Sequence, residues 1–395
     1  MNRIDELIAE LCPDGVEYRK LGEICQIKNG RDYKHLESGS VPVYGSGGFM
    51  GFCVSEASYI GPTVLLPRKG SISNVFYVEG PIWNVDTVFY TIVNEEIILT
   101  RYFYHVMLNA HIENYSTGGA ARPSLTQTAL NQIEIPVPPI EVQREIVRIL
   151  DSFTELEAEL EAELEARKAQ YAYYRDRLLS RENLEAMDGK PVEMKRLDAC
   201  GGFERGKRFT KSDYRDNGIP CIHYAEVYTE YQLATSRTVS FVRNDMGESL
   251  RFANKGDLVI ACTGETKEDI AKSIVWEGDE PVAIHDDCHI LHVSDGLNSR
   301  YLSYCFQTDN FTKTKIAYAT KGKTVRIAAS RLASISIPVP SLATQQKVVD
   351  ILDRFDALTT SLTDGLPAEI EARKAQYAYY RDRLLDFPRK EVTAS

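Results

Sequence analysis

The sequence predicts an α/β protein in which two mixed α/β domains are joined by two long antiparallel coiled-coil helices, with an internal pseudo-two-fold repeat. Three observations predict it: a repeat spaced by about 200 residues, a helical hydrophobic period late in each copy, and short strand-like runs early in each copy. The 395 residues suit two domains of about 150 residues with connecting structure. We place the boundaries at 1–140, 141–190, 191–340 and 341–395.

The repeat is identical in one segment and diverged in another. The sequence EARKAQYAYYRDRLL occurs at 165–179 and again at 371–385. Upstream, IEIPVPPIEVQREIVRILDSF (133–153) matches ISIPVPSLATQQKVVDILDRF (335–355) at an offset of 202 residues. Weaker echoes precede these segments, at 16–25 and 192–200, and as a shared Pro and Asp at 81–86 and 281–286. A period this long indicates a duplicated domain-plus-helix unit rather than a solenoid. The helices therefore perform one task twice, and the globular parts perform different tasks.

The globular segments show short apolar runs that are bounded by Gly or Pro, as is typical of strands. The strands predicted from these runs are Thr63–Leu66, Val75–Val78, Val88–Val93, Asp257–Ala261 and His289–Val293. The helices predicted within the domains are Thr100–Asn109 and Ser299–Thr308. Both globular segments are therefore expected to be mixed α/β.

After Pro138-Pro139 the apolar residues follow a helical period. The 4–3 spacing predicts a coiled-coil seam, with polar Glu157 and Arg167 at two seam positions; its apolar members are Ile146, Leu150, Phe153, Leu160, Leu164, Tyr171, Tyr174 and Leu178. About 40 helical residues would make a rod of roughly 60 Å. The acidic stretch 155–167 could also form a single solvated helix, but two matched rods in one chain favour antiparallel packing against each other.

The second rod contains Gly365-Leu366-Pro367 after its first apolar stretch. Proline inside a helix breaks or restarts it, so we expect a kink there. From the Phe of the seam to the shared EARK the second rod has four residues more than the first, close to one helical turn, which preserves the phase of the apolar face.

Bulk properties limit where the protein works. The chain has no apolar run of 18 residues, and its first residues are acidic and lack an apolar stretch, so we expect neither a membrane span nor a signal peptide. The eight cysteines are scattered without a CxxC pair, which fits reduced thiols. These features predict a cytoplasmic protein. The net charge is −11, but 13 of the acidic residues lie in 141–190, and the two globular segments hold 30 basic residues.

Basic loops that contain glycine are the candidates for nucleic-acid contact. Arginine and lysine bind phosphates and base edges, and a neighbouring glycine lets the backbone approach a phosphate. The first domain offers Lys28, Arg31, Tyr44, Ser46, Arg68, Lys69 and Arg122. The second offers Arg205, Lys207, Arg208, Lys211, Lys321, Lys323 and Arg326. The alternative interpretation is that these are solvated surface loops.

The repeated helical sequence also carries candidate protein contacts. Tyrosine and arginine are favoured at protein interfaces, and both are repeated here. The candidate partner-binding residues are Tyr173, Arg175, Arg177, Tyr379, Arg381 and Arg383. Tyr171 and Tyr174 fit the seam of the helix pair equally well.

The chain resembles type I restriction-modification specificity subunits over nearly its whole length. The resemblance lies in the paired EARKAQYAYYRDRLL segments, in YGSGG at 44–48, in RKGSIS at 68–73, and in a PVP–Gln junction before each rod, formed by Pro136, Pro138 and Gln143 and by Pro338, Pro340 and Gln345. It implies two target-recognition domains, two helical spacers, and a double-stranded DNA target with two unlike half-sites. It also implies two methyltransferase subunits and restriction/translocase subunits as partners, with no membrane involved.

The resemblance implies a non-catalytic subunit without a cofactor of its own, since S-adenosylmethionine, ATP and Mg are expected on the partner subunits. The residues also argue against methylation by this chain. The only Pro-Pro leads into a helix, whereas an amino-methyltransferase needs an Asn/Asp-Pro-Pro-aromatic catalytic loop. Because the chain is acidic overall, we expect it to bind DNA poorly alone and tightly with its methyltransferase partners.

Two further residue patterns suggest other chemistry, and one further function needs none. Asp257, Glu265 and Lys267 resemble a metal-nuclease pattern and are the basis of an alternative enzymatic function. His285, Cys288, His289 and His292 form HxxCHxxH, but strand alternation would split them between two faces, so we predict no metal site. A two-headed protein adaptor without DNA binding is the remaining alternative.

Overall fold

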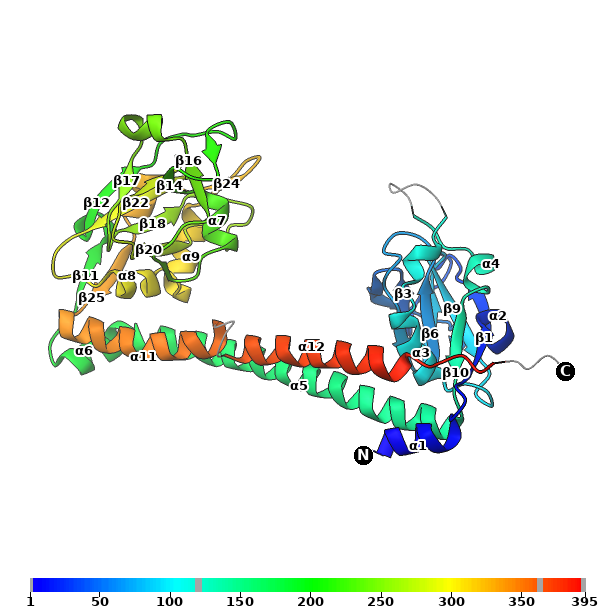
Figure 1. Ribbon diagram of the computed structural model, residues 1–395. Helices are drawn as coiled ribbons and strands as arrows, with labels where there is room; N and C mark the ends of the chain where they lie inside the picture. Colours follow the sequence, from blue (N-terminus) through cyan, green and yellow to red (C-terminus); the bar gives the residue numbers. More distant parts are fainter. Residues whose placement is uncertain (1–2, 118–122, 361–364, 392–395) are drawn as a thin grey trace. The chain divides into compact units, whose positions relative to one another are not determined.

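A computed structural model describes residues 3–117, 123–360 and 365–391 of the chain. The chain divides into two compact units: unit 1 comprises residues 1–161 and 369–395, and unit 2 comprises residues 162–368 (Figure 1). Each unit contains one globular domain and two helical segments from different copies of the repeat.

Unit 1 contains two four-stranded sheets and one two-stranded sheet. The sheets have the strand orders β2-β9-β6-β7, β4-β3-β8-β5 and β1-β10. Its strands are β1 (Glu17–Lys20), β2 (Cys25–Asn29), β3 (Ser38–Gly45), β4 (Gly48–Val54), β5 (Tyr59–Ile60), β6 (Thr63–Pro67), β7 (Phe76–Val78), β8 (Pro81–Asn84), β9 (Val88–Val93) and β10 (Glu134–Val137). Its shorter helices are α1 (Arg3–Leu11), α2 (Leu21–Ile24), α3 (Thr100–Asn109), the 3-10 helix η1 (Ile112–Tyr115) and α4 (Gln127–Leu130).

Unit 2 contains two five-stranded sheets, a three-stranded sheet and a two-stranded sheet. The strand orders are β12-β22-β18-β20-β15, β13-β16-β14-β21-β17, β19-β24-β23 and β11-β25. Its strands are β11 (Glu193–Arg196), β12 (Gly201–Arg205), β13 (Tyr214–Arg215), β14 (Ile219–Ile222), β15 (Ala234–Thr235), β16 (Ser240–Val242), β17 (Phe252–Ala253), β18 (Leu258–Ala261), β19 (Thr263–Gly264), β20 (Ser273–Trp276), β21 (Val282–Ile284), β22 (Cys288–Val293), β23 (Thr320–Lys321), β24 (Val325–Arg326) and β25 (Ser336–Val339). Its shorter helices are α6 (Arg181–Asp188), η2 (Leu197–Ala199), α7 (Tyr224–Thr229), η3 (Asn244–Ser249), α8 (Ser299–Cys305), α9 (Asp309–Tyr318) and α10 (Ala329–Ala333).

The long helices confirm the predicted interruption of the second rod. The first rod is one continuous helix, α5 (Ile140–Leu178), and the second is two helices, α11 (Leu342–Thr360) and α12 (Leu366–Leu385). Pro367 lies in the first turn of α12, where a missing backbone N–H costs no helical hydrogen bond. Within unit 1, Lys374 of α12 lies 3.7 Å from Glu157 and 3.3 Å from Glu161 of α5.

The core of each unit lies where strands and helices bury their apolar faces. In unit 1, every residue of β6 is buried, and Tyr102 and Phe103 of α3 are fully buried. In unit 2, β18 is buried throughout, and α8 buries Tyr301 and Tyr304. The predicted mixed α/β fold class is confirmed, and the predicted strands and helices match β6, β7, β9, β18, β22, α3 and α8 within a few residues at their ends.

The same buried glutamine attaches a rod to its domain in both copies. In unit 1, Oε1 of Gln143 accepts from the amide of Leu99 at 2.8 Å and Nε2 donates to Pro138 O at 2.7 Å. In unit 2, Oε1 of Gln345 accepts from the amide of Asn298 at 2.8 Å and Nε2 donates to Pro340 O at 2.9 Å. The PVP–Gln junction therefore has a structural role. Its glutamine side chain forms hydrogen bonds with backbone groups that burial would otherwise leave unpaired.

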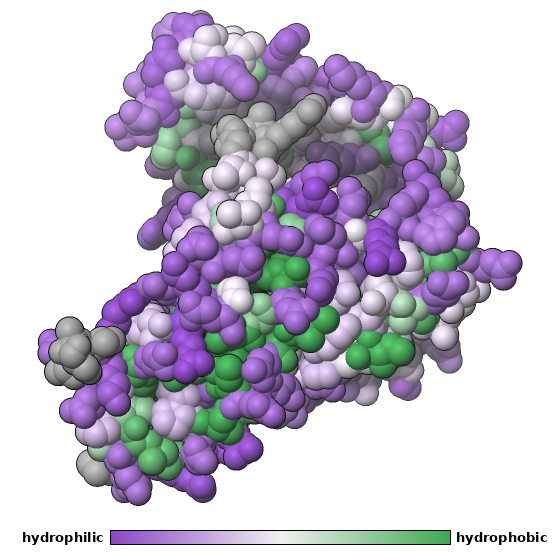
Figure 2. Space-filling model, turned by 90° about the vertical axis from the view of Figure 1, so that its right-hand side faces the viewer, coloured by the Kyte–Doolittle hydropathy of each residue, from purple (hydrophilic) through white to green (hydrophobic). Residues whose placement is uncertain are grey.

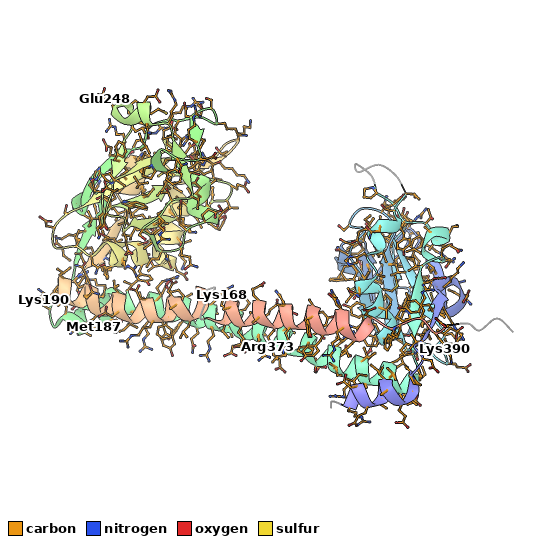
Figure 3. The ribbon with its side chains drawn as sticks, viewed as in Figure 1. Lys168, Met187, Lys190, Glu248, Arg373 and Lys390 are labelled. Carbon is orange, nitrogen blue, oxygen red and sulfur yellow. The ribbon has the colours of Figure 1, made fainter. Side chains whose placement is uncertain are left out.

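Side chains extend along both helical segments of each unit (Figure 3). Within unit 2, Figure 3 places Glu248 of η3 at the end of the domain opposite Met187 and Lys190. Across the described residues, we find no helix with both the length and the apolar character required to cross a bilayer.

Candidate nucleic-acid interface

In unit 1 a glycine lets the loop after β2 press against the end of β8. A Cβ at Gly30 would lie 1.9 Å from the carbonyl O of Val85, so only glycine fits without movement of the backbone. The amide of Arg31 donates to Asn84 O at 2.9 Å. This close approach brings the predicted basic loop beside the turn that contains Asp86.

Three predicted residues of unit 1 gather around that turn. Nζ of Lys69 lies 3.7 Å from the Asp86 carboxylate, and the guanidinium of Arg68 donates to Asp86 O at 3.3 Å. The amide of Ser46 donates to Thr87 Oγ1 at 3.3 Å. A surface pocket of about 440 Å³ lies here, and Lys34, Ser46 and Asp86 are among its lining residues.

Unit 2 repeats this arrangement at the equivalent position. A Cβ at Gly206 would lie 2.2 Å from His285 O, and the amide of Lys207 donates to Ile284 O at 2.8 Å. The loop after β12 is thereby held against the end of β21, as the loop after β2 is held against β8. The scaffold is shared, whereas the side chains that it presents differ between the units.

The second domain concentrates basic side chains in one open pocket of about 620 Å³. Its lining includes four predicted residues from two distant segments: Arg205, Arg208, Lys211 and Arg326. Arg205 Nε donates to Asp286 O at 2.8 Å, and a guanidinium nitrogen of Arg326 lies 3.9 Å from the Asp287 carboxylate. Both arginine side chains are largely exposed, at 60% and 64%. Pairing thus orients these guanidinium groups while leaving them accessible to a ligand.

Other predicted residues lie apart from these two clusters. Lys28 is exposed on β2, and Tyr44 is half-buried with its ring 6.0 Å from that of Phe49. Lys321 and Lys323 are exposed in the β23–β24 hairpin, which projects from the domain in Figure 1. Arg122 lies outside the residues that the structure describes.

His223, which no sequence pattern indicates, joins His285 in the pocket of unit 2. The two rings lie 4.5 Å apart, and burial, followed by the charge of His285, lowers the pKa of His223. Nδ1 of His223 accepts from the amide of Ala225 at 3.2 Å, so the ring caps helix α7. The signal that could have located this pocket is the Asp shared by 81–86 and 281–286, because it marks the turn in both units.

Among the described residues, one group of three potential metal ligands has its ligand atoms all within 4.8 Å of one another. It consists of His223, His285 and Asp287. Their hydrogen bonds fit a structural role. Nε2 of His285 lies 3.1 Å from Phe209 O, and its Nδ1 lies 3.3 Å from the amide of Asp287. A metal ion would have to displace these hydrogen bonds, and the absence of a metal site therefore stays our prediction.

The HxxCHxxH residues do not assemble. Cys288 is buried in the apolar core, and His292 Nδ1 lies 2.8 Å from the Asp257 carboxylate. His285 instead faces His223, at the opposite end of β22 from His292. Two features separate these four residues. His285 lies before β22 begins, and successive side chains within β22 point to opposite faces of the sheet.

The metal-nuclease interpretation is wrong in its geometry. Asp257 precedes β18, and Glu265 and Lys267 follow β19. The four residues of β18, at about 3.3 Å each, span roughly 13 Å of backbone between Asp257 and the segment that leads to Glu265 and Lys267. Asp257 instead accepts from the amide of Asn254 at 2.8 Å and from His292, so it stabilises a turn.

In both copies of the repeated helical sequence the same tyrosine is the most exposed one. Tyr173 and Tyr379 are equivalent, and each is 61% exposed. Arg177 is also exposed, and Arg383 lies 3.6 Å from Asp5. Arg175 is buried beside Tyr171 and pairs with Asp176 at 2.7 Å, so we remove it from the candidate partner contacts. Arg381 is largely covered and pairs with Asp382 at 2.9 Å.

The exposed surface is mainly polar. Figure 2 shows hydrophilic residues over most of the visible face, with smaller groups of hydrophobic residues between them. Exposed large hydrophobic residues of unit 1 include Phe49, Met50 and Ile60. Phe49 and Met50 line the pocket beside Ser46, where apolar side chains could meet a base or a sugar.

Comparison with known proteins identifies the family from the sequence. The profile of the type I restriction modification DNA specificity domain matches twice, at residues 13–166 and 189–372. A Haemophilus influenzae protein with the provisional name type I restriction enzyme specificity subunit is 30% identical over 94% of this chain and 96% of its own length. The specificity subunit of an Escherichia coli type I restriction enzyme is 31% identical over 75% of this chain and 73% of its own length.

Solved structures share the fold at low sequence identity. The crystal structure of a type I restriction-modification S subunit from M. genitalium has a TM-score of 0.53 at 15% identity, covering 94% of this chain and 96% of that one. A second structure, from a study of complex assembly in the type I system, has a TM-score of 0.57 at 18% identity, covering 94% of this chain and 98% of that one.

Proposed function

This chain belongs to the family of type I restriction-modification DNA specificity subunits, and we propose that it reads a bipartite DNA target, one half with each unit, while its repeated helical sequence binds methyltransferase subunits. A specificity subunit has a non-catalytic role in its restriction-modification complex, and the predicted non-enzymatic function is confirmed by this membership. The target with two halves and the docking of partners are our inferences.

The observation that carries the proposal is one scaffold with two different sets of side chains. Gly30 and Gly206 hold equivalent loops against equivalent strand ends. Around the shared aspartate, unit 1 presents Arg68 and Lys69, whereas unit 2 presents Arg205. Two readers built alike but differing at the reading surface would recognise unlike half-sites, since base identity is read by side chains at base edges.

The pocket of unit 2 has the chemistry that DNA reading requires. Arginine can bind guanine through two hydrogen bonds or neutralise a phosphate. The paired carboxylates of Asp286 and Asp287 hold Arg205 and Arg326 in position before DNA arrives. Positioning reduces the entropy lost on binding, so the acidic residues aid recognition even though they lower the local positive charge.

The repeated helical sequence would bind the same partner twice. Its two copies are identical, and Tyr173 and Tyr379 are equally exposed. We propose two methyltransferase subunits at these copies, with restriction/translocase subunits joining the complex. S-adenosylmethionine, ATP and Mg would then be bound by those subunits, and this chain would bind no cofactor.

The net charge of −11 has a consequence for DNA affinity. Long-range repulsion opposes binding of the isolated chain, so we expect weak binding alone and tight binding when the methyltransferase subunits close around the duplex. Measuring the dependence of affinity on salt checks that phosphates are contacted, because neutralised phosphates release counterions. Binding that is independent of salt would favour the protein-adaptor alternative.

Methylation mapping tests the two-reader proposal directly. The chain is expressed with its methyltransferase subunit, and modified bases are mapped by single-molecule sequencing. A variant in which residues 191–340 come from another specificity subunit should change one half of a split motif and keep the other. An active, assembled complex that modifies no split motif would contradict the proposal.

A further inference from the structure

The C-terminal segment after α12 runs along unit 1 and pairs with it at one parallel β-bridge, between Val16 and Arg389. The amide of Val16 donates to Pro388 O at 2.9 Å, and the amide of Lys390 donates to Val16 O at 3.0 Å. The hydroxyl of Tyr18 donates to Phe387 O at 2.8 Å. The segment is thus bound by backbone pairing, as a peptide is bound by strand addition.

Side chains anchor this segment as well. Phe387 is 5% exposed and belongs to the core cluster that includes Val106, Ile112 and Ile135. Arg389 lies over the ring of Tyr18 at 4.3 Å and binds the Glu134 carboxylate at 2.6 Å. The segment therefore occupies a groove with one aromatic anchor and one basic anchor.

The duplication places an equivalent groove in unit 2. Tyr18 pairs with Pro136 in the β1–β10 sheet, and Met194 pairs with Pro338 in the β11–β25 sheet. After the first copy of EARKAQYAYYRDRLL, however, the chain turns at Ser180, whose side chain caps α6. The chain continues into α6 instead of running as an extended strand along this groove.

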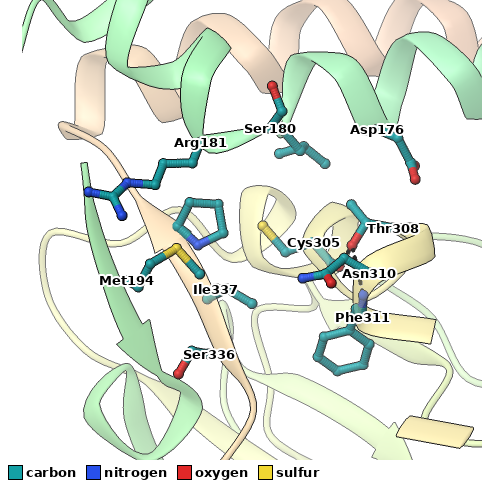
Figure 4. Close-up of a pocket in the computed structure, with 12 residues that line it drawn as sticks. Asp176, Ser180, Arg181, Met194, Cys305, Thr308, Asn310, Phe311, Ser336 and Ile337 are labelled. Atoms are coloured by element: carbon teal, nitrogen blue, oxygen red, sulfur yellow. Dashed lines mark hydrogen bonds between the residues drawn. The ribbon is translucent and has the colours of Figure 1, made fainter. Parts of the chain in front are cut away.

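At this place unit 2 has an open pocket of about 270 Å³ (Figure 4). Its walls include Met194, Cys305, Phe311 and Ile337, the last three being the counterparts of Val106, Ile112 and Ile135. A cavity of about 150 Å³ is enough to hold benzene. The pocket thus has room for one aromatic side chain, and Met194 offers the thioether that aromatic rings favour.

Two differences from unit 1 define what would bind. Ser336 stands where unit 1 has Glu134, so a basic anchor has no carboxylate partner at that position. The amide of Val192, the counterpart of Val16, donates to the Glu185 carboxylate at 3.1 Å. Backbone pairing would have to displace Glu185, which leaves the aromatic anchor as the main source of affinity.

We propose that this groove of unit 2 binds an extended segment of a different protein chain, in which an aromatic residue precedes a proline. The segment that fits the equivalent groove is Phe387-Pro388, and in this chain it is already bound within unit 1. In a second copy of this chain, the same segment would already be bound to unit 1 of that copy. The groove therefore favours another protein that carries this chemistry, and the inference goes beyond DNA reading and does not depend on it.

A fluorescent peptide with the sequence of Asp386–Glu391 tests the proposal on the full chain. We expect one equivalent to bind. Met194→Arg should weaken binding by at least about tenfold, because the affinity rests on burying one aromatic side chain. Leu11→Arg is the matched control, since Leu11 of α1 is similarly exposed, at 40% against 41% for Met194, but lies in unit 1; it should leave peptide affinity unchanged.

A second variant separates the two grooves. Phe387→Ala should loosen the chain's own segment and raise the stoichiometry from one peptide to two. Binding to Phe387→Ala but not to the unaltered chain would overturn the proposal, as would affinity that Met194→Arg leaves intact. A concentration-dependent dimer of the unaltered chain that Met194→Arg abolishes would assign the groove to a second copy and overturn the assignment to a different chain.

Discussion

Phe153 stacks on Tyr380 in unit 1 with ring centroids 5.3 Å apart and an interplanar angle of 23°. Their counterparts Phe355 and Tyr174 stack in unit 2 at 6.2 Å and 22°. In each pair one ring comes from the start of one rod and the other from the repeated sequence of the other copy. Each unit is therefore completed by both copies of the repeat.

Asp151 should be a main anchor between α5 and the domain of unit 1. Its carboxylate lies 2.7 Å from His105 Nε2 and 2.9 Å from Arg101 Nε. Asp151→Asn should lower the free energy of unfolding at pH 7 by about 1–3 kcal/mol, because it leaves the buried His105 and the partly buried Arg101 without their charged acceptor. Denaturant unfolding measures this loss. Asp382→Asn, an exposed aspartate of α12, is the control and should change stability by less than about 0.5 kcal/mol.

The same substitution should change the response to acid. Burial raises the pKa of Asp151, but hydrogen bonds from His105 and Arg101 outweigh it, and the net pKa is lowered. A pKa that is lower in the folded state contributes stability above the unfolded value of about 3.9 and loses it as the pH falls through the folded value. The stability difference between the two proteins should thus shrink only in that acidic range. A difference that is already lost at pH 6 would contradict this assignment.

Gly206→Ala should disturb the reading surface of unit 2, because the new Cβ would lie 2.2 Å from a backbone oxygen. We expect a loss of about 1–3 kcal/mol in stability and weaker DNA binding by the assembled complex. Gly202→Ala is matched to it: a Cβ there would meet no heavy atom of the described chain within 4 Å. Equal effects of the two substitutions would show that the close approach of the loop to β21 is unimportant.

Arg205→Ala and Arg326→Ala should each weaken DNA binding by the complex by about 1–3 kcal/mol. If the arginine binds a phosphate, the slope of log affinity against log salt concentration should become shallower by about one. If it binds a base, the sequence preference should relax in one half-site. Titrations at several salt concentrations distinguish these cases. Arg196→Ala, an exposed arginine that also pairs with an aspartate, is the control and should have no effect on DNA affinity.

Lys315→Met should stabilise unit 2 at neutral pH. Burial lowers the pKa of Lys315 to about 8, although Asp269 and Glu268 act in the opposite direction. Because the unfolded chain has the ordinary value of about 10.4, folding is penalised below pH 8, and that penalty fades as the pH rises toward about 10. We expect a gain of about 1–3 kcal/mol at pH 7 that vanishes near pH 10. Lys313→Met, at an exposed position of the same helix α9, should show no such gain.

Tyr173→Ala and Tyr379→Ala should each reduce the amount of methyltransferase subunit that co-purifies, and together they should abolish the complex. The reason is that interface energy concentrates in a few aromatic and arginine anchors. Native mass spectrometry would count the subunits. Tyr115→Ala, an exposed tyrosine outside the rods, serves as control, and full assembly of the double variant would exclude these side chains as contacts.

The duplication, the fold class and the family can all be recognised from the amino-acid sequence alone. Identical helical segments and a period of about 200 residues could be seen without coordinates, because helix-forming patterns and repeats are local features of the chain. The break before Pro367 is likewise predicted, since proline disrupts a helix interior but is tolerated in the first turn of a new helix. The predicted strands Val88–Val93 and Thr63–Leu66 follow from short apolar runs bounded by Gly or Pro, and they correspond to β9 and β6.

Which side chains from distant segments meet becomes visible only in the folded chain. Arg205 and Arg326 share a pocket although they lie far apart in the sequence, and His223 enters it from a segment without a sequence signal. Arg175 looked like a surface residue but is buried over Tyr171. Asp257 and Glu265 looked like a pair, but strands β18 and β19 lie between them. The physical reason is that local patterns fix periodicity and direction, whereas contacts between distant segments depend on how sheets and helices pack.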